Sequence, residues 1–388
     1  MNLFDVYKLW PIEPVKGEGC TIYDRDGVEY LDMYGGHAVI SIGHSHPYYT
    51  GMIKDQLNNL AFYSNSVQNP LQRKLAYDLG KMCGYEEYSL FLSNSGAEAN
   101  ENAIKLASFH TGKSKVLAFK GSFHGRTSGA VAVTDNPLLS SPFNSSRKVK
   151  FVALGDLDAV KREFSSGEYA AVIIEGIQGV AGIVDPGNLF LKELKKIAKK
   201  SGVVLIIDEV QSGYGRTGKF FAHQYSGVKA DIVTVAKGMA NGFPIGGTII
   251  SPSFTAISGM LGTTFGGNHL ACAAAIAVLD VIRDEELVMM AYEKGKYLLD
   301  KLGSLKKRLG NGVITEIRGK GLMIGIEMDE GFIPVRNALL FEEKIFTGGA
   351  KSNIIRLLPP LTISREQLDH FLVSFENAIE KHKTRVGS

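Results

Sequence analysis

Residues 231–247 read DIVTVAKGMANGFPIGG, an apolar run that leads into a loop with four glycines and one proline. The run Asp231–Val235 predicts a buried strand, and Lys237 follows its end. Burial lowers the pKa of a lysine amine toward the range in which the amine is nucleophilic. Lys237 is therefore the first candidate catalytic residue. A solvated surface lysine is the alternative, which a tightly turned loop disfavours.

Short apolar runs like this one alternate with helical patterns from about Ser89 to Ser251. Their hydrophobicity is continuous, which is typical of strands that are covered on both faces of a parallel sheet. Strands are predicted at residues 89–92, 115–119, 149–152, 171–174, 203–207, 231–235 and 248–250, and helices at 97–108 and around 190–198. The sequence thus predicts an α/β fold whose large domain contains a mostly parallel sheet.

A smaller α+β domain is predicted toward the C-terminus. Apolar residues at helical spacing predict an amphipathic helix over 368–379, and residues 318–327 predict one glycine-led strand. A chain of 388 residues is also too long for a single ordinary core. We expect an N-terminal segment (1–45) that contributes to the small domain, a large cofactor-binding domain (46–282) and a small C-terminal domain (283–388).

Composition argues against several classes of protein. The 43 basic and 40 acidic residues are spread along the chain and give a net charge of +3, so nothing indicates a nucleic-acid partner. The longest apolar run, Leu270–Leu279, is about half as long as a membrane span. Cys20, Cys83 and Cys272 lie far apart, which fits a reducing compartment better than a disulfide framework. We expect a cytoplasmic protein that does not associate with membranes.

A carboxylate follows a second predicted strand, where residues 203–207 lead into Asp208. A lysine and an aspartate at strand ends are the two protein groups that a pyridoxal phosphate (PLP) enzyme needs, for a Schiff base and for the pyridinium nitrogen. A buried carboxylate keeps that nitrogen protonated, and Lys237 could act as general base and acid. Capping of the next segment is the alternative role for Asp208. Gln211 could reach the ring hydroxyl from the same loop.

A phosphate site is predicted where residues 93–100, SNSGAEAN, lead from a strand into a helix. The backbone N–H groups of Ser95, Gly96 and Ala97 would be free there to bind an anion. An ordinary turn in which Ser95 is the N-cap is the alternative.

Further candidates come from three other segments. Phe123 could stack on a flat cofactor ring and Arg126 could bind a substrate carboxylate, although a core position and a surface ion pair fit equally well. Thr263 and Thr264 supply hydroxyls in a glycine-rich loop, suited to phosphate or carboxylate. Arg356 lies within an apolar strand and needs an anionic partner, either a structural carboxylate or a substrate.

Two patterns suggest other cofactors. Residues 213–218, GYGRTG, match the dinucleotide fingerprint, but no clear helix follows them, so NAD binding is disfavoured. His44 and His46 are not completed by a cluster of cysteines or acids, so we expect hydrogen-bonding roles in a loop and no metal site.

These motifs, in this order, resemble the class III (ornithine-type) aminotransferases over nearly the whole chain. The most specific elements are DEVQ at 208–211 and TFGGN at 264–268, together with NSGAEAN at 94–100 and FHGRT at 123–127. The resemblance implies a PLP-dependent transferase of fold type I, a homodimer with its active sites at the subunit interface. It implies transfer of the δ-amino group of N-acetylornithine, or of another N-acylornithine, to 2-oxoglutarate in arginine biosynthesis, giving the acylglutamate semialdehyde and glutamate.

The resemblance also implies roles for residues of this chain. The expected cofactor-binding residues are Ser95, Gly96 and Ala97 at the phosphate, Phe123 on the ring, Asp208, Val210 and Gln211 around it, Lys237 as the Schiff-base lysine, and Thr264 from the partner subunit. The expected substrate-binding residues are Arg126, Thr263 and Arg356, of which Arg356 would bind the α-carboxylate of 2-oxoglutarate or glutamate.

One position departs from the family pattern. Many members have a second glutamate that pairs with the carboxylate-binding arginine, whereas this chain reads EGIQGV at 175–180 and has Val180 at that place. We therefore expect Arg356 to be unmasked in both half-reactions. The departure makes N-succinylornithine a competing donor.

Other functions remain open at this stage. Within the same fold, the donor could also be ornithine, 4-aminobutyrate or an acetylated lysine, and a glutamate-1-semialdehyde aminomutase is less favoured. From other classes, an NAD-dependent dehydrogenase and a catalytically silent PLP-fold binding protein are the alternatives; the presence of both Lys237 and Asp208 disfavours the second.

Overall fold

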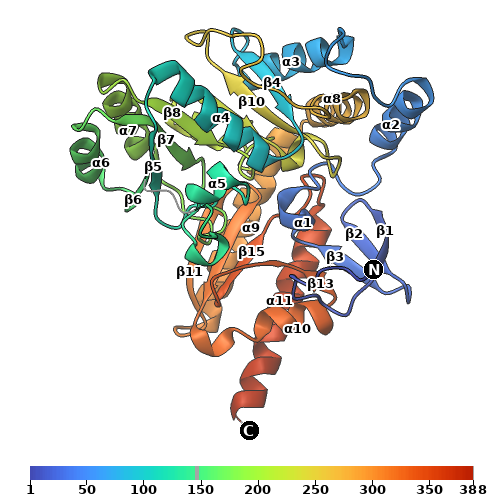
Figure 1. Cartoon of the computed structure of the whole chain (residues 1–388). Helices are drawn as coiled ribbons and strands as arrows, with labels where there is room; N and C mark the ends of the chain where they lie inside the picture. The colour runs from blue at the N-terminus through green and yellow to red at the C-terminus, as the bar shows by residue number, and fades with distance from the viewer. Residues whose placement is uncertain (145–147, 388) are drawn as a thin grey trace.

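A seven-stranded sheet forms the upper part of the molecule in the computed structural model, which describes residues 1–144 and 148–387 (Figure 1). Its strand order is β4 (Ser89–Ser93), β10 (Gly246–Ile250), β9 (Ile232–Val235), β8 (Val204–Asp208), β7 (Tyr169–Glu175), β5 (Lys115–Phe119) and β6 (Val149–Val152). Strand β10 runs antiparallel to both of its neighbours, and the other pairings from β9 to β6 are parallel. The predicted α/β fold with a mostly parallel sheet is therefore confirmed.

Helices cover both faces of this sheet. In β5, Val116 and Ala118 pack into one apolar cluster with residues of α4 (Gly96–Thr111). Leu117 and Phe119 belong to a second cluster with residues of α7 (Asn188–Lys200) and α8 (His269–Asp284). Successive side chains of a strand point to opposite faces, so burial on both faces produces the continuous hydrophobicity of the sequence.

The carboxyl ends of the parallel strands meet at one edge of the sheet. Strand β7 ends at Glu175 and β8 at Asp208, and these two residues are paired in register. Strand β9 ends two residues before Lys237, and β4 ends three residues before the start of α4. The loops that carry the candidate residues are therefore neighbours, as is usual for ligand sites in parallel sheets.

Two smaller sheets lie below the large one in Figure 1. One has the order β1 (Pro14–Glu18), β2 (Thr21–Asp24), β3 (Glu29–Asp32) and β13 (Ile345–Phe346), so it joins the two ends of the chain. The other has the order β11 (Ile314–Lys320), β12 (Met323–Met328), β15 (Ile354–Leu357) and β14 (Gly348–Ala350). The pairing of β3 with β13 is consistent with an N-terminal segment that contributes to the small domain, and the boundaries at residues 45 and 282 stay predictions.

The remaining helices pack around the large sheet and the two smaller sheets. They are α1 (Gly35–Ala38), α2 (Pro47–Asn59), α3 (Pro70–Cys83), α5 (Ser128–Ala132), α6 (Leu157–Phe164), α9 (Leu287–Leu309), α10 (Val335–Phe341) and α11 (Arg365–Gly387). Short 3-10 turns are η1 (Pro137–Leu139), η2 (Ala222–Ser226), η3 (Lys237–Met239) and η4 (Glu330–Phe332). In the part of the chain that the structure describes, no helix combines the length and the apolar character needed to cross a membrane.

The prediction of a single strand over residues 318–327 is wrong. The segment is the turn of an antiparallel hairpin, in which Lys320 of β11 pairs with Met323 of β12. Gly321, at the turn, has a φ of 53°, in the left-handed region that glycine adopts at little cost. The mostly apolar residues 322–326, which follow this glycine, concealed the turn in the sequence.

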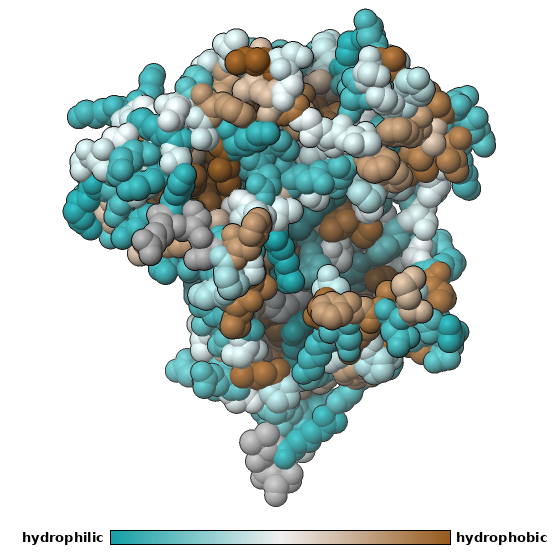
Figure 2. Space-filling model, viewed as in Figure 1, coloured by the Kyte–Doolittle hydropathy of each residue, from teal (hydrophilic) through white to brown (hydrophobic). Residues whose placement is uncertain are grey.

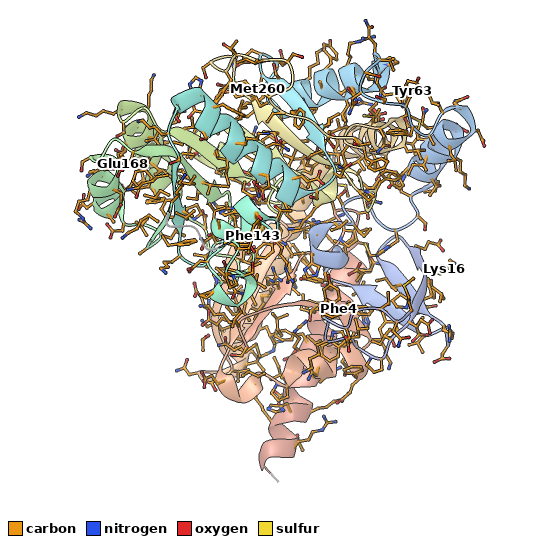
Figure 3. All side chains as sticks on the ribbon, in the orientation of Figure 1. Phe4, Lys16, Tyr63, Phe143, Glu168 and Met260 are labelled. Carbon is orange, nitrogen blue, oxygen red and sulfur yellow. The ribbon has the colours of Figure 1, made fainter. Side chains whose placement is uncertain are left out.

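Large apolar side chains are exposed in two segments. Figure 2 shows brown side chains at the surface over α2. In Figure 3, the label of Tyr63 lies close to α2, and the label of Phe4 lies over the part of the molecule that contains the two smaller sheets. The exposed apolar residues in and after α2 include Tyr48, Leu57, Leu60, Phe62, Tyr63 and Val67, and those near the N-terminus include Leu3, Phe4, Tyr7 and Leu9. Contiguous exposed apolar surface of this kind is typical of an interaction surface.

The contact between α9 and the β11–β12 turn gives a test of packing in the small domain. A Cβ atom at Gly295 would lie 2.2 Å from the carbonyl group of Gly321. Gly295→Ala should therefore lower the free energy of unfolding by about 1–3 kcal/mol, because backbone must move. Gly303→Ala is the matched control in the same helix, where nothing lies within 4 Å. It should leave stability unchanged or raise it by up to about 1 kcal/mol. Equal urea midpoints for the two variants would contradict this account.

Candidate functional site

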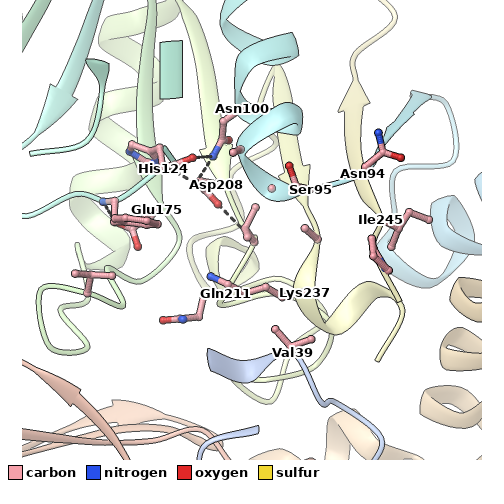
Figure 4. Close-up of a pocket in the computed structure, with 18 of the residues that line it drawn as sticks. Val39, Asn94, Ser95, Asn100, His124, Glu175, Asp208, Gln211, Lys237 and Ile245 are labelled. Atoms are coloured by element: carbon pink, nitrogen blue, oxygen red, sulfur yellow. Dashed lines mark hydrogen bonds and ion pairs between the residues drawn. The ribbon is translucent and has the colours of Figure 1, made fainter. Parts of the chain in front are cut away.

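A cavity of about 320 Å³ opens at the carboxyl edge of the large sheet (Figure 4). Its lining includes eight residues that the sequence singled out: Ser95, Gly96, Ala97, Phe123, Asp208, Val210, Gln211 and Lys237. Its size is in the range of small-molecule sites, and its walls combine apolar side chains with a few polar groups. The structure thus brings most of the predicted cofactor-binding residues to one place.

Lys237 lies in this cavity between Asp208 and Val39 in the view of Figure 4. Burial lowers the pKa of its amine, while the nearby carboxyl groups of Asp208 and Glu175 act in the opposite direction. Its φ of 47° is costly for a residue with a side chain, so the loop must be held firmly. Ser41 supplies part of that support, because its hydroxyl donates a hydrogen bond to the carbonyl oxygen of Gly238 at 2.9 Å.

Asp208 is only 4% exposed and accepts several hydrogen bonds. Its Oδ2 accepts one from the Asn100 amide at 2.8 Å and lies 2.8 Å from Nδ1 of His124, and its Oδ1 accepts one from the backbone N–H of Val210 at 2.9 Å. Such contacts hold a carboxylate in a fixed orientation inside the protein. Asn100 and His124 were not assigned roles from the sequence, and no local pattern distinguishes them.

The N-terminus of α4 forms one end of the cavity. Ser95 is its N-cap, because its hydroxyl accepts a hydrogen bond from the backbone N–H of Glu98 at 3.2 Å. The first N–H groups of a helix have no acceptor within the helix, so those of Gly96 and Ala97 remain suited to an anion. A Cβ atom at Gly96 would lie 2.7 Å from Val210, so a larger residue would not fit here. The cap and the anion site therefore coexist.

Glu175 is a buried acid of the cavity that the sequence did not single out. One of its carboxyl oxygens accepts a hydrogen bond from the N–H of Phe123 and the other from that of Gly179, both at 3.0 Å. Burial is the largest cause that raises its pKa, to about 7, and nearby Asp208 adds to the effect. The carboxyl group thus ties together two loops that line the site.

Arg356 lies beside the cavity and is 5% exposed. Its guanidinium group donates hydrogen bonds to the Tyr34 hydroxyl at 2.9 Å and to the carbonyl oxygens of Gly349 at 3.0 Å and Gly179 at 3.2 Å. The sequence predicts an anionic partner for this arginine, but its hydrogen-bond acceptors among the described residues are uncharged. Val180, which follows Gly179, lines the cavity and is 44% exposed.

Besides Arg356, three other predicted residues lie outside the cavity of the single chain. Arg126 is exposed and does not line it. Thr263 accepts hydrogen bonds from the Asn94 amide at 3.3 Å and from the N–H of Gly266 at 3.1 Å. Thr264 is exposed at the surface. Their roles in binding stay predictions.

The two patterns that suggested other cofactors have structural roles. In the GYGRTG segment, Arg216 is buried and donates a hydrogen bond to the carbonyl oxygen of Pro359, and a 3-10 turn rather than an α-helix follows at Ala222. His44 lies 2.8 Å from Asp32 and His46 lies 2.9 Å from Glu285, so the predicted hydrogen-bonding roles of the histidines are confirmed. Within residues 1–144 and 148–387, no group of three His, Cys, Asp or Glu side chains could hold a metal ion.

Comparisons with known proteins agree with one another. The family model described as aminotransferase class-III matches residues 6–379. The acetylornithine aminotransferase of Bacillus subtilis (strain 168) is 39% identical over 386 residues, which cover 98% of each chain. The crystal structure of the ornithine aminotransferase from Toxoplasma gondii ME49 aligns with a TM-score of 0.93 at 27% identity, over 99% of this chain and 93% of that chain. A second structure of a Toxoplasma gondii ornithine aminotransferase, with partial occupancy of PLP at its active site, aligns with a TM-score of 0.89 at 29% identity, over 97% and 93%.

Because the pKa of Glu175 is raised, the free energy of unfolding should depend on pH. Between the ordinary glutamate pKa of 4.5 and about 7, the unfolded chain loses this proton while the folded chain keeps it. The contribution of Glu175 to the free energy of unfolding is therefore present below pH 4.5, is lost as the pH rises to about 7, and is constant above it. Its total is about 3 kcal/mol.

Glu175→Gln removes this ionisation. The free energy of unfolding of the cofactor-free proteins is measured in urea at pH 5 and at pH 8. From pH 5 to pH 8, the difference between Glu175→Gln and wild type should shift by about 2–3 kcal/mol in favour of the variant. Glu193→Gln, which removes an exposed partner of Lys196, is the control. Its free energy of unfolding relative to wild type should change by less than about 0.5 kcal/mol between the two pH values. A pH-independent difference for Glu175→Gln would contradict the assignment.

Proposed function

The chain belongs to the class-III aminotransferase family, and from this premise we propose that it transfers the δ-amino group of N-acetylornithine to 2-oxoglutarate with PLP as its cofactor. The products are N-acetylglutamate 5-semialdehyde and glutamate, which places the reaction in arginine biosynthesis. The proposal of this donor is supported by curated relatives named acetylornithine aminotransferase at 38–40% identity over nearly the full length. The predicted resemblance and the predicted fold type I are both confirmed.

One observation carries the proposal: an amine with a lowered pKa and a hydrogen-bonded carboxylate face the same cavity beside a helix N-terminus. These three groups match the carbonyl, the ring nitrogen and the phosphate of PLP. When bound, PLP withdraws electrons from the carbon that carries the substrate nitrogen. The residues present therefore fit the cofactor.

Each lining residue has a task in this proposal. Lys237 would hold the cofactor covalently, and its amine, whose pKa is lowered by burial, would be suited to move a proton at the substrate carbon. Asp208 would hold a positive charge at the ring nitrogen, and Gln211 would contact the ring hydroxyl. The N–H groups of Ser95, Gly96 and Ala97 would hold the phosphate, and Phe123 and Val210, which line the same cavity, would contact the ring.

The substrates are an amino acid and a keto acid, and their carboxylates require cationic groups. We propose that Arg356 binds the α-carboxylate of 2-oxoglutarate and glutamate, and that Arg126 and Thr263 contact the acylated donor. The uncharged acceptors around Arg356 support this role, because no carboxylate of the described chain competes for its guanidinium group.

A homodimer is part of the proposal. The Phe62 ring lies 5.5 Å from that of Phe265, and Asn65 donates a hydrogen bond to the carbonyl oxygen of Thr263 at 3.1 Å. The loop that carries Thr264 thus borders the exposed apolar segment after α2. A second copy of the chain that covers this segment would place Thr264 near the partner's cavity. We also propose a cytoplasmic location, which three free buried cysteines support.

Replacement of the lysine tests the core of the proposal. PLP-loaded wild type should be yellow, and borohydride should fix the cofactor on Lys237, as peptide mass spectrometry would show. Lys237→Ala should lose at least about 10²–10⁴-fold in turnover and give no reduced adduct. Lys120→Ala removes another strand-end lysine, exposed and paired with Asp135, and should behave as wild type. A colourless wild type without amino transfer would refute the proposal.

A second prediction concerns Val180 and the choice of donor. Val180→Glu puts a carboxylate beside Arg356 at a partly exposed position, so an ion pair of about 1 kcal/mol should form. The ratio of kcat/KM for glutamate to that for N-acetylornithine should fall about 5-fold to 10-fold. Val180→Gln, of similar size without charge, is the matched control. Rates on N-succinylornithine, ornithine and 4-aminobutyrate, measured alongside, identify the preferred donor. Unchanged ratios in Val180→Glu would show that the two positions do not interact.

A further inference from the structure

Asp208 is held by a short chain of buried polar side chains that reaches into the next strand. Thr234 of β9 donates a hydrogen bond from its hydroxyl to Oδ1 of Asn100 at 2.7 Å. The amide nitrogen of Asn100 in α4 then donates to Oδ2 of Asp208 at 2.8 Å and to the carbonyl oxygen of His124 at 2.8 Å. Figure 4 shows Asn100, His124 and Asp208 joined by dashed lines on one side of the cavity.

The hydrogen bonds of the Asn100 amide are complete. Its nitrogen has two hydrogens and two acceptors, and its oxygen accepts from Thr234. A flipped amide would direct its oxygen at two other oxygens, the carboxylate of Asp208 and the carbonyl of His124. Thr234 and Asn100 are both almost completely buried, so water does not replace a lost partner easily. The two oxygens of Asp208 and His124 thus select one orientation of the amide, and the hydroxyl of Thr234 satisfies and fixes the amide oxygen at the other end.

This arrangement divides the two oxygens of Asp208 between different tasks. Oδ2 has contacts with both Asn100 and Nδ1 of His124, whereas Oδ1 has one donor among the residues that the structure describes, the backbone N–H of Val210. A carboxylate oxygen can accept two hydrogen bonds. Oδ1 therefore keeps acceptor capacity for a group in the cavity, while Oδ2 anchors the side chain.

We propose that Thr234 and Asn100 are positioning residues which, through Oδ2 of Asp208, keep Oδ1 directed at the ring nitrogen of the cofactor. The inference rests on the proposed binding of PLP and extends it to two residues that do not touch the cofactor. If one of the hydrogen bonds between Thr234, Asn100 and Asp208 is lost, Asp208 holds the proton on the ring nitrogen less firmly. The positive charge on the ring lowers the pKa of the nitrogen that joins the cofactor to Lys237. When this charge is held less firmly, that pKa rises, and the apparent pKa of the visible absorption band rises with it.

The sheet provides a matched control for this proposal. Thr248 of β10 is paired in register with Thr234, is equally buried, and also donates one hydrogen bond to α4, to the carbonyl oxygen of Ala99 at 3.1 Å. Thr234→Val and Thr248→Val therefore remove the same hydroxyl from the same interface. Only the first breaks the chain of hydrogen bonds that leads to Asp208.

The experiment is a spectrophotometric pH titration of PLP-loaded wild type, Thr234→Val, Thr248→Val and Thr234→Ser. Thr234→Val should raise the apparent pKa of the absorption band by about half a unit or more, and Thr248→Val and Thr234→Ser should match wild type. Thermal unfolding of the cofactor-free proteins should show similar losses for the two valine variants. In steady-state assays, kcat should fall for Thr234→Val with little change in KM.

The outcomes separate this inference from the proposed function. A wild type that binds no PLP would refute the function itself. A yellow wild type in which Thr234→Val and Thr248→Val titrate alike would overturn the positioning role alone. Asn100→Ala gives a second test, because it removes the amide directly and should shift the band at least as far as Thr234→Val. A titration unchanged in Asn100→Ala would also overturn the inference.

Discussion

Asp208 belongs to a row of side chains whose places are set by strand register. It pairs with Glu175 of β7 on one side and with Thr234 of β9 on the other, and Thr234 pairs with Thr248 of β10. Side chains alternate between the faces of a sheet, so a slip of one residue would turn a whole strand's set to the opposite face. Backbone pairing therefore fixes the geometry of the site before its side chains interact with one another.

The charges of the site depend on one another within a small volume. Burial alone favours the neutral form of both Lys237 and Glu175, while Asp208 opposes it for the lysine and reinforces it for the glutamate. Asp208 accepts hydrogen bonds from Asn100 and from the backbone N–H of Val210, and it lies 2.8 Å from Nδ1 of His124. The result is one firmly held carboxylate, with an amine nearby whose pKa is lowered and an acid whose pKa is raised to about 7.

Much of this arrangement could be predicted from the sequence, and the rest depends on contacts between distant segments. The strands were predictable because burial on both faces leaves continuous apolar runs, and Lys237 and Asp208 because each follows such a run. Asn100 and Glu175 gave no local signal: Asn100 meets Asp208 across 108 residues of sequence and Thr234 across 134. Arg126 and Thr264 resemble family residues, yet they lie outside the cavity of one chain.

Arg356 is surrounded by the hydroxyl of Tyr34 and by carbonyl oxygens, with the Tyr34 ring 5.6 Å from its guanidinium carbon. If Arg356 binds a substrate carboxylate, as proposed, that carboxylate competes with these uncharged acceptors and need not separate an ion pair first. When the anion leaves, the same acceptors are again available to the buried guanidinium group, so that the charge is not left without hydrogen-bond partners.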